Sequence, residues 1–147
     1  MNPDLDRFEE LIHYHFNDRQ LLVKALTHRS FSAEKQLDFD NQRLEFLGDS
    51  VIQLIISEYF FKQFPEEREG KLTNLRTALV HRQALADAAR TILLGEHIYM
   101  GKGEIESRGF ERESTLCDAF EALLGALYLD GGLKPAQNLL LEIVRTM

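Results

Sequence analysis

The sequence has little cysteine, little proline and no tryptophan: its 147 residues include one cysteine and three prolines. Because Cys117 is alone, no disulfide can form within the chain, and with no base beside it we expect a small core residue rather than a nucleophile. No apolar stretch reaches the roughly 20 residues of a membrane span, since the longest, 51–64, is interrupted by polar side chains. The acidic start lacks the apolar region of a signal peptide. These absences predict a cytoplasmic protein with no membrane partner.

Basic residues are also in short supply. Lysine and arginine total 17 against 24 aspartates and glutamates, which gives a formal net charge of −7. Proteins that bind nucleic acid usually carry clustered basic residues that neutralise phosphates, so charge alone argues against tight binding of RNA by this chain. Bound divalent cations would reverse the charge locally wherever acids cluster.

Signals for β-strands are sparse, because no segment sustains an alternation of apolar and polar residues. The spacing of apolar residues instead predicts an all-α protein with a single domain, residues 1–147, and about seven helices. A long central helix is expected from about residue 40 until Pro65 ends it. Asn2 and Asn17 are expected to cap the first two helices. Later helices are expected over 71–80, 82–93, 114–129 and 134–144.

Two segments are predicted to be irregular. The polar stretch 30–39 is expected to be a loop, ordered by hydrogen bonds from His28. The segment 101–113, which is charged and contains glycine, is expected to be a surface loop with room for one short turn of helix.

Two pairs of acids interrupt otherwise apolar helical segments. Glu45 and Asp49 are spaced i, i+4, while Asp118 and Glu121 are spaced i, i+3, so each pair shares one face of its helix. Small residues, Gly48 on one helix and Gly125 on the other, favour close packing of the two helices. Buried charge is costly unless compensated, and paired carboxylates on two helices are typical of a hard divalent cation such as Mg²⁺.

This chemistry suits hydrolysis of a phosphodiester, which needs an activated water and stabilisation of the charge that develops on the phosphate. A structural alternative is that the acids are solvated or paired with Arg43, Arg112 or another base. A carboxylate-bridged di-iron bundle is a second alternative, although its Glu-x-x-His elements are absent. The five histidines do not have the spacing of a zinc site, because His13 and His15, two residues apart, would point away from each other on a helix and no His-Glu-x-x-His occurs.

The order of several motifs resembles that of the ribonuclease III family. The segment 41–50, Asn-Gln-Arg-Leu-Glu-Phe-Leu-Gly-Asp-Ser, is similar to the family signature, and 116–130 is similar to its second acidic segment. Shorter matches at 25–30, 68–73 and 101–104 occur in the family's order. The resemblance implies a homodimeric, Mg²⁺-dependent endonuclease that hydrolyses double-stranded RNA, in which Mn²⁺ can replace Mg²⁺ and no organic cofactor is needed. Family products carry 5′-phosphate and 3′-hydroxyl ends with short 3′ overhangs.

The resemblance also assigns roles to residues. Glu45, Asp49, Asp118 and Glu121 match the family's catalytic and metal-site acids, and all four are intact. Gln42 departs from the pattern, because the family commonly has a glutamate there, and a neutral amide cannot act as a base. Glu69 matches an acid near the scissile phosphate, with an exposed loop acid as the alternative.

Phe46 matches an aromatic residue that inserts into a second subunit, with packing in its own core as the alternative. The duplex-binding domain that usually follows in bacterial members has no counterpart in the 147 residues. A non-catalytic, dimeric RNA-binding or ribosome-associated relative is the second functional hypothesis.

Overall fold

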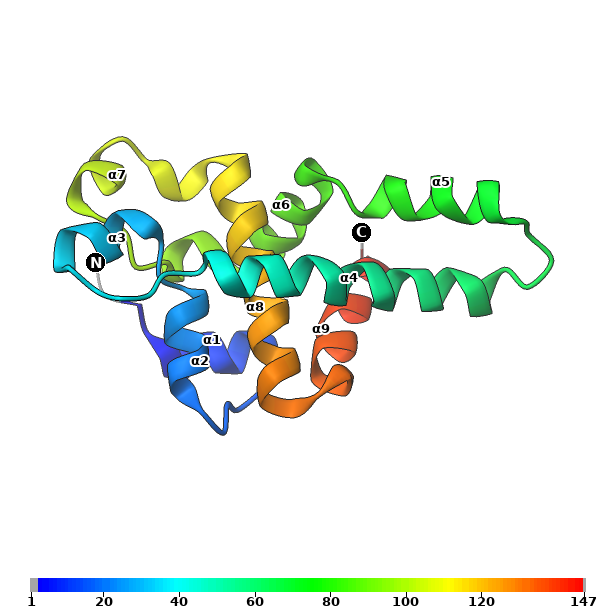
Figure 1. Cartoon of the computed structure of the whole chain (residues 1–147), viewed down its shortest axis with the longest axis horizontal. Coiled ribbons are helices and arrows are strands. Elements are labelled where there is room, and N and C mark those ends of the chain that lie inside the picture. The colour runs from blue at the N-terminus through cyan, green and yellow to red at the C-terminus, as the bar shows by residue number, and fades with distance from the viewer. Residues whose placement is uncertain (1–2, 147) are drawn as a thin grey trace.

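The computed structural model describes residues 3–146 and is built from helices, with no strand among these residues. The nearest approach to sheet pairing is an isolated bridge between Thr27 and Tyr99. The predicted all-α class is therefore confirmed, although the described residues form nine α-helices rather than about seven (Figure 1). The elements are α1 Leu5–Ile12, α2 Arg19–Ala25, α3 Arg29–Lys35, α4 Gln42–Gln63, α5 Glu69–Leu79, α6 Arg82–Thr91, η1 Leu94–His97, α7 Lys102–Glu106, η2 Gly109–Glu111, α8 Glu113–Gly131 and α9 Leu133–Thr146.

The long α4 is the central helix that the sequence predicts. Its 22 residues span roughly 33 Å at the usual rise per residue, and in Figure 1 it runs from the middle part of the molecule, where it crosses α8, to the right-hand end. The second long helix, α8, crosses it and supplies a nearly continuous buried run from Thr115 to Leu127. Fully buried side chains on both helices, such as Ile52 and Leu123, form the core around which the remaining helices pack. No helix among the described residues is long and apolar enough to cross a membrane.

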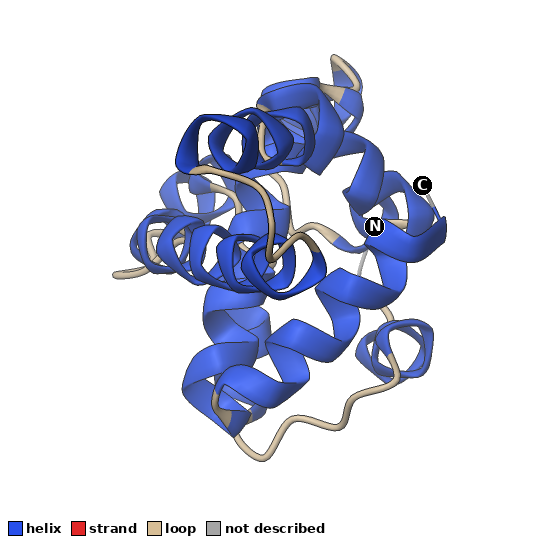
Figure 2. Cartoon of the chain, turned by 90° about the vertical axis from the view of Figure 1, so that its right-hand side faces the viewer, coloured by secondary structure: helices blue, strands red, loops and turns tan. Residues whose placement is uncertain are grey.

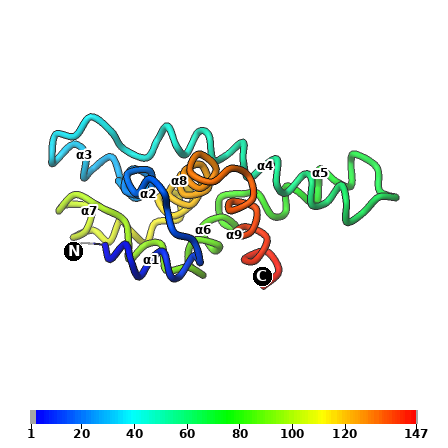
Figure 3. Tube along the Cα trace, turned by 90° about the horizontal axis from the view of Figure 1, so that it is seen from below, coloured from blue at the N-terminus to red at the C-terminus, as the bar shows by residue number. Residues whose placement is uncertain are grey.

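Helix α5 is long but packs loosely, because none of its residues is buried; the short α7 shares this property. The half-buried Leu72, Leu75 and Leu79 of α5 contribute to the edge of the core. The hairpin formed by α4 and α5 projects from one end of the molecule, as Figures 1 and 3 show from two directions. Seen along the long axis, the described chain consists of helices and loops alone (Figure 2).

At the opposite end, the prediction of a loop over 30–39 is wrong, because α3 occupies most of that segment. His28 does make the expected hydrogen bonds, but it caps a helix: its Nδ1 accepts from the backbone N–H of Ser30 at 3.1 Å. Gln36 ends the helix in a left-handed conformation with φ of 54°. Helix α3 is tied to α7 by hydrogen bonds from the N–H of Gly101 to Ser30 and from the N–H of Lys102 to Glu34.

The first two helices are capped by aspartates, not by the predicted asparagines. Asp4 accepts from the N–H of Arg7 and Asp18 accepts from the N–H of Gln20, while Asn2 lies outside the described residues. Asn17 instead donates its own N–H to Asp130 at the end of α8.

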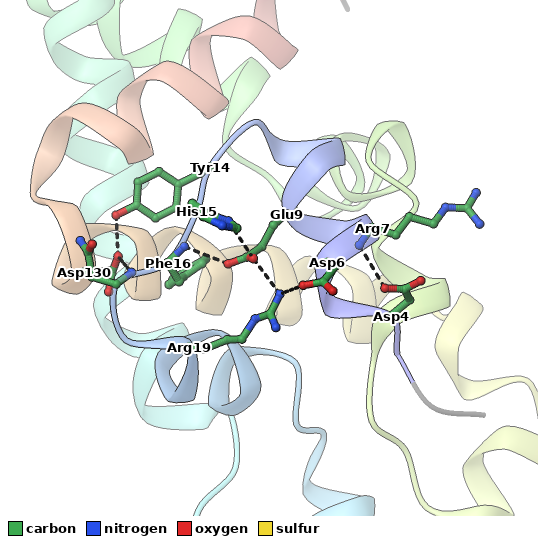
Figure 4. A network of polar contacts seen from close by, with 10 residues as sticks. Asp4, Asp6, Arg7, Glu9, Tyr14, His15, Phe16, Arg19 and Asp130 are labelled. Atoms are coloured by element: carbon green, nitrogen blue, oxygen red, sulfur yellow. Dashed lines mark hydrogen bonds and ion pairs between the residues drawn. The ribbon is translucent and has the colours of Figure 1, made fainter.

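Figure 4 shows the polar network that fixes the linker between α1 and α2. The carboxylate of Asp130 accepts hydrogen bonds from the Tyr14 hydroxyl at 2.5 Å and from the N–H of Asp18 at 2.7 Å, besides that of Asn17. The buried Glu9 accepts from the N–H of Phe16 and from Arg19, both at 2.8 Å. These bonds satisfy a buried charge and attach the N-terminal helices to α8.

Candidate metal centre at the crossing of two helices

Glycines let α4 and α8 approach more closely than any side chain would permit. A Cβ atom added at Gly48 would lie 1.6 Å from the carbonyl oxygen of Glu121, and one added at Gly125 would lie 2.5 Å from that of Leu44. The predicted role of these two small residues is therefore confirmed. Their contact sets the distance between the two helices at the point where the acids emerge.

The crossing brings all four predicted acids together. Asp118 lies within hydrogen-bonding reach of Glu45, and Glu121 within reach of Asp49, so two carboxylate pairs span the interface between the helices. Glu45, Asp49 and Glu121 line a cleft of about 340 Å³, and Asp118 faces a neighbouring cleft that Glu45 also borders. Two pairs that are 69 residues or more apart in sequence thus form one acidic centre.

The four acids have no cationic side-chain partner among the described residues, since none takes part in an ion pair. Arg112, one of the bases considered as a partner, pairs with Glu104 at 2.7 Å instead. The alternative that the acids are neutralised by arginine is therefore wrong.

Burial disfavours the charged forms of three of the acids, Glu45, Asp118 and Glu121, and repulsion between carboxylates adds to the effect at Glu45 and Glu121. Burial raises the pKa of Glu121 to about 8, and the nearby Asp49 adds to the effect. Burial and the charge of Asp118 raise the pKa of Glu45 to about 7, and burial raises the pKa of Asp118 as well. Three carboxylates whose charged forms are disfavoured in this way, gathered at one point, indicate a site that a bound cation would stabilise.

The donor set fits Mg²⁺. Glu121 is only 8% exposed, and no basic, amide or hydroxyl group within residues 3–146 donates a hydrogen bond to its carboxylate. The Cys117 thiol lies 3.8 Å from one of its oxygens and is a weak donor. Carboxylate oxygens are the ligands that Mg²⁺ prefers, and the exposed Asp49 leaves room for water and a phosphate oxygen to complete an octahedral shell. Glu45, Asp49, Asp118 and Glu121 could together hold one ion or a pair of ions.

A second cleft beside the acids carries basic groups, of which Arg29 was not foreseen from the sequence. His28, Arg29 and Arg112 line it together with Glu45 and Asp118. Arg29 is exposed and forms no ion pair within the described residues, so its guanidinium is available to a ligand. Burial lowers the pKa of His28, which favours its neutral form. His28 and Arg29 come from the start of α3 and Arg112 from the start of α8, so tertiary structure brings the two helix ends to the acidic centre.

Three further predicted site residues lie in different places. Gln42, the first residue of α4, borders both clefts. Phe46 is 81% exposed, so the alternative that it packs in its own core is wrong. Glu69 begins α5 beyond the far end of α4, roughly 27 Å or more along that helix from Glu45. Within one chain, Glu69 therefore does not join the acidic centre.

Comparison with known proteins shows the family to which this chain belongs. A family model described as ribonuclease-III-like matches residues 18–147. The chain belongs to the ribonuclease III family. It is 46% identical over 146 residues to ribonuclease 3 of Pseudomonas syringae pv. syringae (strain B728a), with 99% of this chain and 62% of that protein covered.

Another relative is ribonuclease 3 of Ectopseudomonas mendocina (strain ymp), which is 46% identical over 142 residues, or 97% of this chain and 60% of that protein. The chain thus spans about three-fifths of the length of these ribonuclease III relatives.

Solved structures of the nuclease domain of ribonuclease III from Campylobacter jejuni share the fold. One superposes with a TM-score of 0.91 at 38% identity and covers 97% of both chains, and a second has a TM-score of 0.89. The first is described as showing flexibility in a region involved in dimer formation. The helical arrangement here is therefore that of a ribonuclease III nuclease domain.

Proposed function

We propose that this ribonuclease III domain is a Mg²⁺-dependent endoribonuclease that hydrolyses double-stranded RNA. The products would carry 5′-phosphate and 3′-hydroxyl ends with short 3′ overhangs, and Mn²⁺ could replace Mg²⁺. The observation that carries the proposal is the meeting of Glu45, Asp49, Asp118 and Glu121 at one point between α4 and α8, where none of them forms an ion pair with a basic side chain of residues 3–146.

Each acid has a distinct position in the proposed site. Asp118 and Glu121 come from the buried helix α8 and form the inner side of the proposed site. Glu45 and Asp49 come from α4 and border the cleft through which a phosphate would enter. Mg²⁺ held by these oxygens would supply an activated water and neutralise negative charge on the phosphate. Gln42 at the cleft edge can orient a water or phosphate by hydrogen bonding but cannot accept its proton.

The cleft beside the acids would contact the RNA backbone. Arg29 and Arg112 offer guanidinium groups at the edge of the same centre that holds the carboxylates, and guanidinium groups match phosphate geometry. Such contacts recognise the A-form shape and the phosphates rather than the base sequence. With a net charge of −7, the chain would bind duplex RNA mainly through the metal centre and these few groups.

A homodimer is the assembly that this surface supports best. The exposed Phe46 stands beside a pocket of about 1080 Å³ whose lining includes Leu21, Leu37 and Leu129. In a two-fold dimer, Phe46 of each subunit would enter this pocket of the other, because a symmetric interface pairs each surface with its own copy. Two centres related by that axis would address the two strands of a duplex.

The dimer also gives Glu69 a possible place. Because it cannot reach the acids of its own chain, a role near the scissile phosphate requires the projecting α4–α5 hairpin to extend over the partner subunit. Mixing a Glu69→Gln protein with a Glu121→Gln protein tests this arrangement. Restored cleavage by the mixture would support it, and a mixture no more active than its components would exclude it.

The decisive test of function is a cleavage assay on duplex RNA with Mg²⁺ and with EDTA. We expect cleavage with Mg²⁺ alone, and labelling of the products should show 5′-phosphate ends. The alternative of a non-catalytic RNA-binding relative predicts binding without cleavage in either condition. The intact set of four acids, gathered in one centre, favours the enzyme.

A further inference from the structure

Cys117 lies directly against the acidic centre, although the proposed chemistry gives it no role. Its Sγ is 3.8 Å from Oε1 of Glu121, and the side chain is 7% exposed. The expectation of a small buried residue is confirmed, but the thiol faces a carboxylate rather than only apolar neighbours. The ligand atoms of Cys117, Asp118 and Glu121 all lie within 4.8 Å of one another.

We propose that Cys117, Asp118 and Glu121 form a site for a thiophilic divalent cation, Zn²⁺ or Cd²⁺, that shares two carboxylates with the Mg²⁺ site. Occupancy by such a cation excludes Mg²⁺ and blocks cleavage. The competition with Mg²⁺ rests on the proposed function, whereas binding of the soft cation does not.

The geometry suits a tetrahedral ion. With a metal–sulfur distance of about 2.3 Å and a metal–oxygen distance of about 2.1 Å, sulfur and oxygen ligands of zinc lie about 3.6 Å apart. The 3.8 Å between Sγ of Cys117 and Oε1 of Glu121 is close to that value. Asp118 supplies a third ligand from the next position on α8, and water can complete the shell.

Ligand chemistry gives the site its selectivity. Mg²⁺ is a hard ion that binds oxygen, so it gains nothing from a neighbouring thiol. Zinc and cadmium accept thiolate as well as carboxylate ligands, and the sulfur adds a bond that an oxygen-only centre lacks. On binding, the S–H bond of Cys117 breaks, a sulfur–metal bond forms and the proton passes to solvent, with no change in oxidation state.

Glu121 provides the independent indication of a cation. Its carboxylate is more than nine-tenths buried, its polar neighbours are the Cys117 thiol and the carboxylate of Asp49, and it forms no ion pair with a basic group of the described residues. A carboxylate in that setting is stabilised by a metal far more than by a weak thiol donor. Asp118 and Glu121 each border a cleft open to solvent, so an ion can reach them in the folded protein.

Titration of the metal-free protein with Cd²⁺, without RNA or Mg²⁺, tests the site through the ultraviolet charge-transfer band of a cadmium–thiolate bond. Because Cys117 is the only cysteine, the band reports this position alone. We expect a saturable one-to-one signal that Cys117→Ser abolishes while its melting temperature stays near that of the parent. Excess Mg²⁺ should weaken the apparent affinity for Cd²⁺.

Sharing of the carboxylate is tested by two matched substitutions on α8. Glu121→Gln should weaken Cd²⁺ binding about tenfold or more, the usual effect of losing a metal-site interaction, whereas the exposed Glu113→Gln should leave it unchanged. Absence of the band, or an equal affinity in the parent and Glu121→Gln, would overturn the proposal.

Inhibition gives a second readout. Zn²⁺ should suppress Mg²⁺-dependent cleavage at lower concentration in the parent than in Cys117→Ser, each compared with its own activity in Mg²⁺ alone. Equal sensitivity of the two proteins would contradict the shared site. Failure of the proposed function would be seen separately, as a protein that forms the cadmium band normally but does not cleave duplex RNA with Mg²⁺.

Discussion

At the scale of single residues, Glu121 combines two properties that rarely coexist in a stable fold. It is buried on the most deeply packed helix of the molecule, and it faces three other carboxylates without a basic partner. An arrangement of this kind lowers stability unless a cation compensates for it. The loss of stability that this arrangement causes in the metal-free protein therefore indicates that Glu121 has a metal-dependent role rather than a structural one.

Replacement of Glu121 by glutamine removes one charge at nearly constant volume. We expect cleavage of duplex RNA to fall about a hundredfold or more, as it does when a group that stabilises charge at a reaction centre is lost. Melting temperature in EDTA should stay the same or rise, because like charges no longer repel. Glu113→Gln, at the exposed start of the same helix, is the control and should cleave normally. Normal Mg²⁺-dependent activity of Glu121→Gln would remove this residue from the site.

At the scale of elements, the closeness of α4 and α8 determines whether the four acids can meet. The two helices touch through backbone atoms at Gly48 and Gly125, so their separation depends on the absence of two side chains. A small outward movement of either helix would separate Glu45 from Asp118 and Asp49 from Glu121.

Gly48→Ala should therefore disrupt both the fold and the site. The added Cβ would meet backbone 1.6 Å away, and no side-chain rotation can relieve that contact. We expect a loss of about 3 kcal/mol in the free energy of unfolding, measured by urea denaturation. Gly70→Ala is a suitable control, because a Cβ there meets nothing within 4 Å and alanine favours the helix. Similar stabilities for the two variants would contradict the backbone contact.

The anchoring of α1 and α2 to the end of α8 predicts a dependence of stability on pH. Burial by itself raises the pKa of Asp130, but hydrogen bonds from Tyr14 and from the N–H groups of Asn17 and Asp18 outweigh it and hold the pKa below its usual value. A depressed pKa stabilises the folded state above the unfolded pKa of about 3.9. That contribution is lost as the pH falls through the folded pKa.

Asp130→Asn should consequently cost about 1–2 kcal/mol near neutral pH, and the difference from the parent should shrink below about pH 4. Thermal melting from pH 7 to pH 3 measures this. Asp87→Asn removes an exposed ion pair with Arg90 and serves as the control, with an effect below about 1 kcal/mol. A difference between Asp130→Asn and the parent that grows toward low pH would have the wrong sign for this account.

The long helix α4 and the positions of its two acids could be predicted from the sequence, because both depend on strong local patterns. Apolar periodicity and Pro65 defined α4 to within two residues, and the spacing of Glu45 and Asp49 placed them on one face. Helix α3 escaped prediction because its ends are formed by His28 and Gln36, which are not typical capping residues. Arg29 could not be placed beside the acids, since only tertiary packing brings the first turn of α3 to the cleft that Glu45 and Asp118 border.

At the scale of the whole molecule, the exposed Phe46 lies beside a large pocket on the same surface. A second copy of the chain is the partner that we propose for this surface. Phe46 and the pocket are close together on the same face, which is the arrangement that a two-fold interface requires. The dimer would also place two acidic centres on one assembly and bring the projecting hairpin of one subunit toward the other.

Phe46→Ala should weaken the dimer by about thirtyfold, because loss of a buried aromatic anchor costs about 2 kcal/mol or more of binding. Sedimentation over a range of concentrations measures this, and the melting of the monomer should change little since the ring is exposed. Phe61→Ala is the control, being the same residue type on α4 and 70% exposed but outside the lining of this pocket. An equal weakening by both substitutions would place the interface elsewhere along α4.

We propose that the acids between α4 and α8 would hold Mg²⁺ and that the domain would then hydrolyse duplex RNA. The most direct test of this proposal is the single-turnover cleavage rate of a duplex RNA as a function of Mg²⁺ concentration, for the parent and for Asp49→Asn. We predict a rate that rises with Mg²⁺ to a plateau in the parent, a much lower rate that needs more Mg²⁺ in Asp49→Asn, and no cleavage of the separated strands. Cleavage that persists in EDTA, or an Asp49→Asn protein with the Mg²⁺ dependence of the parent, would contradict the account.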